Sequence, residues 1–275
     1  MRVIFVPVAD RPECARALQV AFELGQRIDA SVYGCHMRPH RSSEVSMSSA
    51  FADTSWRRKA TKKAPAAAAA LYREMAEQHG YELVKRPRAA SAAVWKESVG
   101  SPDRLMAING PLADLIVVSR PGNAGGVADM FMKAALLETG RPVLILPQSG
   151  RRKIGRHVCI GWNQSAGVAR TVSSSIALLA EAETVTIVAC GPEDRVGPKS
   201  TQLTNYLKHY GIRAERVVTR GRDIEAELLG ACKDAGADLL LTGAYSKSRW
   251  REKVFGGTTE FLIRKAKLPV LMQHH

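Results

Sequence analysis

The sequence contains the same series of short apolar segments twice, in the same order. The matching pairs are residues 2–8 and 156–162, 30–39 and 183–192, 113–119 and 237–243, and 141–147 and 268–274. In each copy a helix-like stretch follows the first segment, and a proline closes the second. Four pairs in one order indicate an internal duplication, because repeated supersecondary units leave this kind of self-similarity in a sequence. The sequence therefore predicts two domains of one type.

The spacing of the two copies shows where they differ in length. Arg2 lies 154 residues before Arg156, whereas Asp114 lies only 124 residues before Asp238. The first copy therefore contains about 30 additional residues. We place them within residues 38–65, which are rich in Ser, Arg and Lys and follow neither the helix nor the strand period. A long loop is expected there.

Each copy alternates β-branched segments with helix-like stretches of about 12–18 residues. Segments such as 115–118 lack polar alternation, which is typical of strands buried on both faces of a parallel sheet. The pattern predicts an α/β fold of two repeated Rossmann-like domains, each a five-stranded parallel sheet with helices on both faces. The polar segment 148–155 separates the copies, so we expect domain 1 at residues 1–150 and domain 2 at residues 151–275.

The chain is basic: 40 Lys and Arg residues against 26 Asp and Glu residues give a formal net charge of +14. Such an excess favours anionic partners. It is divided between both copies and no nucleic-acid-binding motif accompanies it, so we expect no specific nucleic-acid recognition. No apolar run approaches the ~18 residues of a membrane span, and the first residues lack a signal-peptide core. We therefore expect a cytoplasmic protein without a membrane partner.

Motifs for catalysis or metal binding are missing from the sequence. The five cysteines are widely spaced and form no C-x-x-C pair, which argues against a disulfide framework or a structural zinc site. His36 and His40 have Pro39 between them and do not share a helix face, so we predict no metal there. There is no G-x-S-x-G or H-E-x-x-H motif. Residues 197–201, GPKST, contain only part of a phosphate-loop pattern and are interpreted as the loop before a helix.

In an open parallel sheet, ligands bind beyond the carboxyl ends of the strands, where the chain reverses its winding direction. In the second copy the first such strand ends at Asn163, and the fourth ends at Thr242 and Gly243. Asn163 either faces this crevice as a polar group or caps the next helix together with Ser165. Both interpretations remain open at this point.

The segment after the fourth strand is a candidate anion site. A basic loop at residues 247–253 leads to Gly256 and Gly257, and Thr258 and Thr259 follow at the start of an expected helix. Small residues at a helix start leave N–H groups and hydroxyls free at the positive end of the helix dipole, which favours phosphate. The alternative is a tight turn at the two glycines with Thr258 as a helix cap.

With these residues the chain resembles a tandem member of the universal stress protein family, over nearly its whole length apart from residues 38–65. Nucleotide-binding members show G-x-x-G, nine residues and then G-S/T after the fourth strand, with an Asp after the first. Here Gly243, Ser246 and Gly256 match that spacing. The resemblance implies that the loops at Gly243 and Gly256 wrap ribose and phosphates, and that backbone near Cys190 faces adenine.

Three residues depart from the family pattern. Ser246 replaces the second glycine, Gly257 replaces the hydroxyl residue, and Asn163 replaces the acid. A Cβ at Ser246 opposes a close approach of backbone to phosphate, whereas Thr258 and Thr259 supply hydroxyl groups. We expect a nucleotide site in the second copy. Its candidate residues are Asn163, Cys190, Thr242, Gly243, Ser246, Gly256, Gly257, Thr258 and Thr259.

The first copy departs further from the pattern. It keeps Asp10, but Met132 stands where the spacing requires the small residues of a helix start, and Gly125-Gly126 comes too early. We therefore predict no nucleotide site in the first copy. The resemblance implies that the two domains pair as a pseudo-dimer through their last strands, and it leaves a homodimer of two chains open.

The resemblance predicts a stress-response protein that binds an adenine nucleotide, ATP or AMP, in its second domain and acts as a sensor or adaptor. We predict no metal beyond a nucleotide-associated Mg²⁺. The competing hypothesis is a nucleotide-independent interaction or scaffold protein of the same fold that docks a protein partner. Because no convincing catalytic base is found, hydrolysis of ATP would be slow at most.

Overall fold

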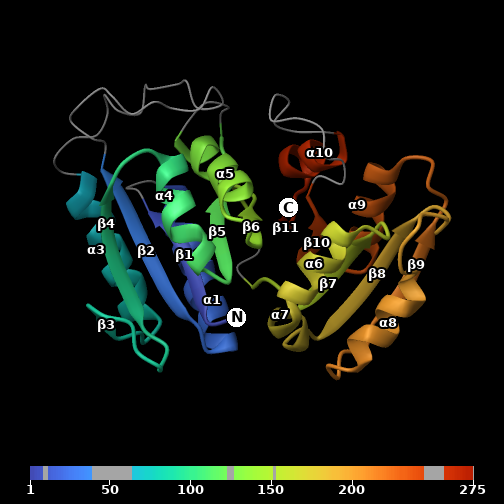
Figure 1. Ribbon diagram of the computed structural model, residues 1–275, viewed down its shortest axis with the longest axis horizontal. Helices are drawn as coiled ribbons and strands as arrows, with labels where there is room; N and C mark the ends of the chain where they lie inside the picture. Colours follow the sequence, from blue (N-terminus) through green and yellow to red (C-terminus); the bar gives the residue numbers. More distant parts are fainter. Residues whose placement is uncertain (9–11, 39–63, 123–126, 151–152, 245–256, 275) are drawn as a thin grey trace. The chain divides into compact units, whose positions relative to one another are not determined.

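The computed structural model describes residues 1–8, 12–38, 64–122, 127–150, 153–244 and 257–274. The chain forms two compact units, Met1–Gln148 and Ser149–His275. Each unit is a parallel sheet with helices on both faces (Figure 1), which confirms the predicted α/β fold class. Most of the 38–65 segment, together with Asp10 and Gly125-Gly126, lies outside the described residues.

The sheet of the first unit places its first strand in the middle. Its neighbouring strands run parallel in the order β3-β4-β2-β1-β5-β6. The bounds are β1 Val3–Val8, β2 Ser31–Arg38, β3 Leu83–Val84, β4 Ala93–Val99, β5 Leu115–Ser119 and β6 Val143–Leu146. The two-residue β3 extends the predicted five-stranded sheet at its edge, and it is too short to produce a recognisable hydrophobic period.

The helices of the first unit cover both faces of this sheet. They are α1 Pro12–Ile28, α3 Ala64–Gln78, α4 Pro102–Asn109 and α5 Val127–Glu138, with a short 3₁₀ helix η2 at Gly110–Leu112. α1 and α3 contact each other on one face, and α4 and α5 contact each other on the other. α3 runs through the alanine-rich stretch after Pro65, with proline in its first turn, where the missing N–H group costs no helical hydrogen bond.

The second unit repeats this plan with five strands in the order β11-β10-β7-β8-β9, and each strand is parallel to its neighbours. The strands are β7 His157–Trp162, β8 Thr184–Cys190, β9 Glu215–Thr219, β10 Leu239–Gly243 and β11 Val270–Gln273. The helices are α6 Ala166–Ser174, α7 Ile176–Ala180, α8 Ser200–Lys208, α9 Ile224–Asp234 and α10 Gly257–Lys265. Right-handed crossovers place α6–α8 on one face and α9–α10 on the other. The chain therefore reverses its winding direction between β7 and β10.

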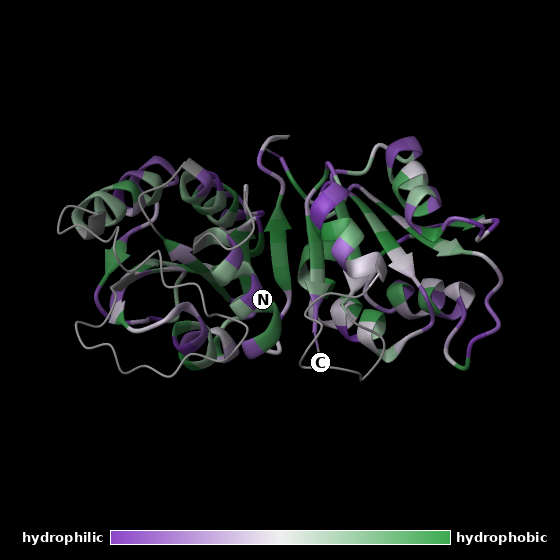
Figure 2. Cartoon of the chain, turned by 90° about the horizontal axis from the view of Figure 1, so that it is seen from above, coloured by the Kyte–Doolittle hydropathy of each residue, from purple (hydrophilic) through white to green (hydrophobic). Residues whose placement is uncertain are grey.

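Apolar strands form the centre of each unit. Leu115–Val118 of β5 and all of β6 and β11 are buried, and Figure 2 shows these strands as hydrophobic bands between more polar helices. Burial of both strand faces explains why their sequences lack polar alternation. Among the described residues, no helix is both long and apolar enough to cross a membrane.

One carboxylate in each unit ties the start of the first strand to the start of a neighbouring strand: β1 to β5 in the first unit, and β7 to β10 in the second. Asp114 Oδ2 accepts hydrogen bonds from the backbone N–H groups of Arg2 (2.6 Å) and Val3 (3.1 Å). Asp238 Oδ1 accepts hydrogen bonds from the backbone N–H groups of three successive residues: Gly155 at 2.8 Å, Arg156 at 3.1 Å and His157 at 3.2 Å. The duplicated sequence positions thus perform the same structural task in both units.

Candidate functional site

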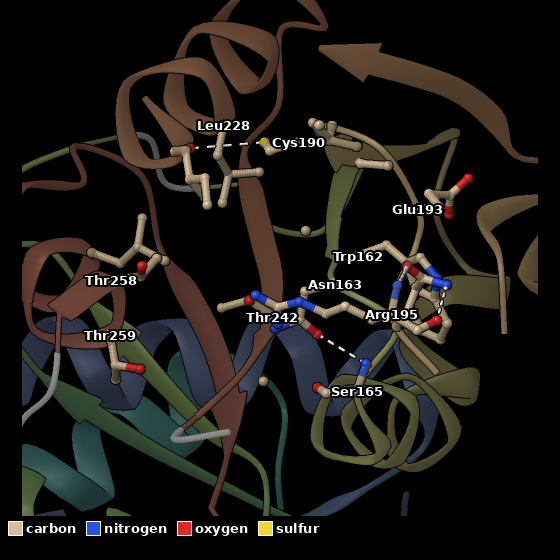
Figure 3. Close-up of a pocket in the computed structure, with 18 of the residues that line it drawn as sticks. Trp162, Asn163, Ser165, Cys190, Glu193, Arg195, Leu228, Thr242, Thr258 and Thr259 are labelled. Atoms are coloured by element: carbon tan, nitrogen blue, oxygen red, sulfur yellow. Dashed lines mark hydrogen bonds between the residues drawn. The ribbon is translucent and has the colours of Figure 1, made fainter. Parts of the chain in front are cut away.

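The second unit contains a pocket of about 190 Å³ at the carboxyl ends of β7, β8 and β10, next to the start of α10 (Figure 3). This is the position where the winding direction reverses and where open α/β sheets bind ligands. The lining residues are Gly161, Trp162, Asn163, Gln164, Ser165, Val188, Ala189, Cys190, Gly191, Pro192, Glu193, Arg195, Ile224, Leu228, Thr242, Gly243, Ala244, Thr258, Thr259 and Leu262.

Six of the nine candidate residues line this one pocket. They are Asn163, Cys190, Thr242, Gly243, Thr258 and Thr259. Gly257 is the first residue of α10, where it has a φ of +34°, and it is not among the lining residues. Ser246, Gly256 and the basic loop at 247–253 lie outside the described residues.

Asn163 both lines the pocket and belongs to the cap of α6. Its Oδ1 accepts the backbone N–H of Ser165 at 3.1 Å, and the Ser165 Oγ accepts the N–H of Val168 at 3.3 Å. The two interpretations of Asn163 are therefore compatible. The bond from Ser165 uses one lone pair of the Asn163 oxygen, so the amide can offer a ligand its NH₂ donors and the second lone pair.

An arm at residues 191–199 leads from β8 to α8 and forms one wall of the pocket. The buried Gln164 holds the backbone of Arg195 at both ends: its Nε2 donates to the Arg195 carbonyl at 3.0 Å, and its Oε1 accepts the Arg195 N–H at 3.2 Å. The Trp162 Nε1–H donates to the carbonyl of Pro198 at 2.8 Å. These bonds fix the arm to the residues that follow β7.

Two glycines bring the ends of β8 and β9 together beside Cys190. Gly191 and Gly221 have φ values of +89° and +74°, and a Cβ on Gly221 would lie 2.5 Å from the Gly191 Cα. The Cys190 thiol points to α9, where its Sγ lies 3.7 Å from the Ile224 carbonyl oxygen (Figure 3). Burial raises the pKa of this thiol. Cys190 is therefore a neutral, weakly polar part of the wall.

The start of α10 carries a hydroxyl that is already paired. Thr258 Oγ1–H donates to a carboxylate oxygen of Glu225 at 2.6 Å. Across the pocket, Gly243 packs against α6: a Cβ there would lie 2.8 Å from the backbone nitrogen of Val168. Helix packing thus requires glycine at position 243 whether or not phosphate approaches it.

The wall has an apolar part suited to a flat ring and a polar part suited to hydrogen bonding. Val188, Ala189, Leu228 and Leu262 supply the apolar surface, and they are buried. Among the described lining residues, Glu193 is the one carboxylate, and there is no histidine or lysine. Apolar surface with a few polar groups is the usual composition of a small-molecule pocket.

Sequence reasoning did not identify Gln164, Glu193, Arg195, Ile224 or Leu228 as site residues. They come from the arm, from the cap of α6 and from α9, and no motif joins these segments. One signal could have found the arm. Glu193 directly follows Pro192, at the end of the second predicted strand, and ligands bind beyond the ends of such strands.

Comparison with known proteins agrees with the resemblance seen in the sequence. Residues 175–274 match the model of the universal stress protein family. No curated protein matches the chain in sequence.

Solved structures of similar fold cover almost the whole chain. A universal stress protein from Archaeoglobus fulgidus DSM 4304 superposes with a TM-score of 0.71 at 12% identity, over 99% of this chain and 96% of its own. A putative universal stress protein from Pseudomonas aeruginosa UCBPP-PA14 gives 0.58 at 14% identity, over 99% and 93%. At these identities the likeness concerns the fold. Residues 175–274 therefore match the universal stress protein family, and the chain as a whole has the fold of solved proteins of that family.

Proposed function

We propose that the pocket of the second unit binds an adenine nucleotide, ATP or AMP, and that the protein acts as a sensor or adaptor in a stress response. The observation that carries this proposal is the convergence of Asn163, Cys190, Thr242, Gly243, Thr258 and Thr259 on one pocket. Strand ends in the sequence and the family resemblance point to these same positions, independently of the pocket.

The chemistry of the wall supports a nucleotide. The apolar side chains of Val188, Leu228 and Leu262 suit the faces of a purine ring, and hydroxyl and amide groups from Asn163 and Thr242 suit ribose. The Glu193 carboxylate accepts hydrogen bonds from the backbone N–H and the hydroxyl of Ser200. A carboxylate so occupied is a poor general base, which favours a binding role over ATP hydrolysis.

Calorimetry with nucleotide-stripped protein tests the proposal. ATP and AMP are titrated separately, with and without Mg²⁺, into the wild-type chain and into two variants of α10. Thr258→Trp places an indole in the pocket and should abolish binding. Phe261→Trp alters an exposed side chain of the same helix that does not line the pocket, and should leave binding intact.

Heat from both nucleotides that disappears in Thr258→Trp alone supports the proposal. No heat at millimolar nucleotide in the wild-type chain would overturn it and would favour the nucleotide-independent interaction protein. Equal heat in both variants would place the binding site outside this pocket.

A further inference from the structure

The sheet of the second unit ends in a strand with an open edge. β9 is the last strand in the order β11-β10-β7-β8-β9 (Figure 1), and among the described residues it pairs with β8 alone. The corresponding strand of the first unit is β4, and there the chain itself adds β3, which places Leu83 and Val84 beside Ala93 and Val94. Within its described residues, the chain therefore covers this edge in the first unit and leaves it uncovered in the second.

The open edge of β9 presents backbone groups that can pair with another strand. The Thr219 carbonyl accepts the N–H of Gly191, which follows β8, at 3.2 Å, so the backbone groups of Thr219 point towards β8. Successive residues of a strand alternate in this direction, and the N–H and C=O groups of Arg216 and Val218 therefore point to the open edge. Such a row of backbone groups is a template for an added strand.

The middle of β9 is apolar and exposed. Val217 and Val218 are 39% and 55% exposed. Arg216 Nε donates to the Oγ of Ser200, the first residue of α8, at 2.9 Å, which places the Arg216 side chain on the α8 face of the sheet. Because side chains alternate between the faces, Val218 lies on the α8 face and Val217 on the α9 face. A strand added at this edge would therefore cover apolar surface on both faces.

Arginines surround the open edge. Arg213, Arg216, Arg220 and Arg222 are exposed, and Glu215 is the one acidic residue between positions 213 and 222. None of these arginines forms an ion pair with another described residue. Their charges give this edge a positive potential, which attracts acidic groups. A second copy of the chain would bring the same arginines against each other, so the charge disfavours pairing between two β9 strands.

We infer that the open edge of β9 is a docking site for an acidic, extended segment of a partner protein. The segment adds a strand beside β9, where its backbone pairs with Arg216 and Val218 and its carboxylates face the arginines. None of the four arginines lines the nucleotide pocket, and neither does Val217 or Val218. The inference is therefore independent of the proposed nucleotide binding.

Fluorescence anisotropy with labelled synthetic peptides tests this docking site on the full chain. The probe is a capped octapeptide of alternating glutamate and valine. One control peptide replaces the glutamates with lysines, and the other keeps the glutamates but carries an N-methyl group on every residue, so that it has the same charge and no N–H groups. The glutamate peptide should bind at least about tenfold more tightly than either control, because they lack the charge attraction or the backbone hydrogen bonds.

Substitutions in the chain separate the backbone contribution from the charge contribution. Val218→Pro removes an N–H at the open edge and no bond to β8, and it should weaken binding of the glutamate peptide about fivefold or more. Val218→Thr keeps the N–H and the branched side chain and should change the affinity less than about twofold. Arg220→Glu should weaken binding about threefold or more at low salt, whereas Lys267→Glu, the same charge reversal at an exposed residue before β11, should not.

Tight binding of the glutamate peptide that is lost in Val218→Pro and kept in Val218→Thr supports the inference. Equal binding of the glutamate peptide and its N-methylated form would overturn it, because charge alone would then account for the attraction. Tighter binding of a single-stranded oligodeoxynucleotide of the same charge would also overturn it and would make nucleic acid the partner.

Thermal unfolding verifies that each variant is folded, and the N-methylated peptide tests the backbone contribution on the wild-type chain. Failure of the glutamate peptide to bind the wild-type chain would overturn the docking site and leave the proposed nucleotide binding untouched. Failure of ATP and AMP to bind would overturn the proposed function and leave the docking site standing.

Discussion

The contact between Gly191 and Gly221 offers a test of how the pocket wall is built. These glycines follow β8 and β9, and both have left-handed backbone conformations, with φ values of +89° and +74°. In Gly221→Ala the new Cβ would lie 2.5 Å from the Gly191 Cα and 2.9 Å from its nitrogen. Real Cβ atoms do not approach backbone this closely, so the two strand ends must separate.

The loss of unfolding free energy in Gly221→Ala has two parts, and a second glycine allows us to separate them. Gly211 has the same φ of +74°, and a Cβ added there would have no atom within 4 Å. Gly211→Ala should therefore lower the unfolding free energy only by the conformational cost of a left-handed residue with a side chain, about 1–2 kcal/mol. Gly221→Ala should lower the unfolding free energy by the same conformational cost and by a further ~1–3 kcal/mol for overpacking against Gly191.

Urea unfolding monitored by circular dichroism measures both losses in the full chain. The difference between the two variants is the quantity of interest, because the conformational term cancels. We also expect weaker AMP binding in Gly221→Ala and unchanged binding in Gly211→Ala, since only the former moves the backbone next to Cys190. Equal unfolding free energies in the two variants would refute the reasoning, because they would mean that the contact with Gly191 relaxes at no cost.

Three further substitutions test other parts of the fold. Asp238→Ala leaves three backbone N–H groups at the start of β7 without their acceptor and should lower the unfolding free energy by about 2–4 kcal/mol, measured with urea. Tyr72→Phe removes a buried hydrogen bond to a strand carbonyl at 2.6 Å and should cost about 1–2 kcal/mol in the same assay. Hydrogen bonds from Thr219 and from the backbone of Gly221 and its neighbours hold the pKa of Glu227 at about 2. Because this pKa lies below the usual value, the stabilisation by Glu227 is complete above about pH 4.5 and is lost as the pH falls towards 2. The difference in Tm between the wild-type chain and Glu227→Gln should therefore be largest at neutral pH and should shrink below pH 4.5; a constant difference would contradict this origin.

The fold was predictable because its signals are local. A strand buried on both faces, such as β5, needs an unbroken apolar run, and a duplicated chain shows such runs twice at matching positions. The two-residue β3 was not predictable, because two residues cannot display a period. The exposed β9 is similarly weak in the sequence, since its residues carry no buried face that would impose alternation.

The candidate site was predictable only where strand ends determine it. Parallel strands bring their carboxyl ends to one edge, so Asn163 and Thr242 were found from strand positions alone, whereas Cys190 came from the family resemblance. Arg195 depends instead on the Gln164 amide, 31 residues away in sequence, and such a long-range hydrogen bond leaves no local pattern. Gly243 shows a further limit: its spacing suggested close approach of phosphate, whereas its contact with Val168 gives helix packing as a sufficient reason for glycine.

The two units are alike at the amino ends of their strands and differ beyond the carboxyl ends. At the amino ends of the strands, Asp114 and Asp238 make equivalent hydrogen bonds, so the duplicated scaffold is kept there. At positions matched by spacing after the fourth strand, the units diverge: α10 begins at Gly257, whereas Met132 is buried inside α5, which begins five residues earlier at Val127. Changes beyond the carboxyl ends do not disturb the aspartate-anchored ends. A duplicated sheet of this kind can therefore change beyond the carboxyl ends of its strands in one unit while the aspartate-anchored ends stay alike in both.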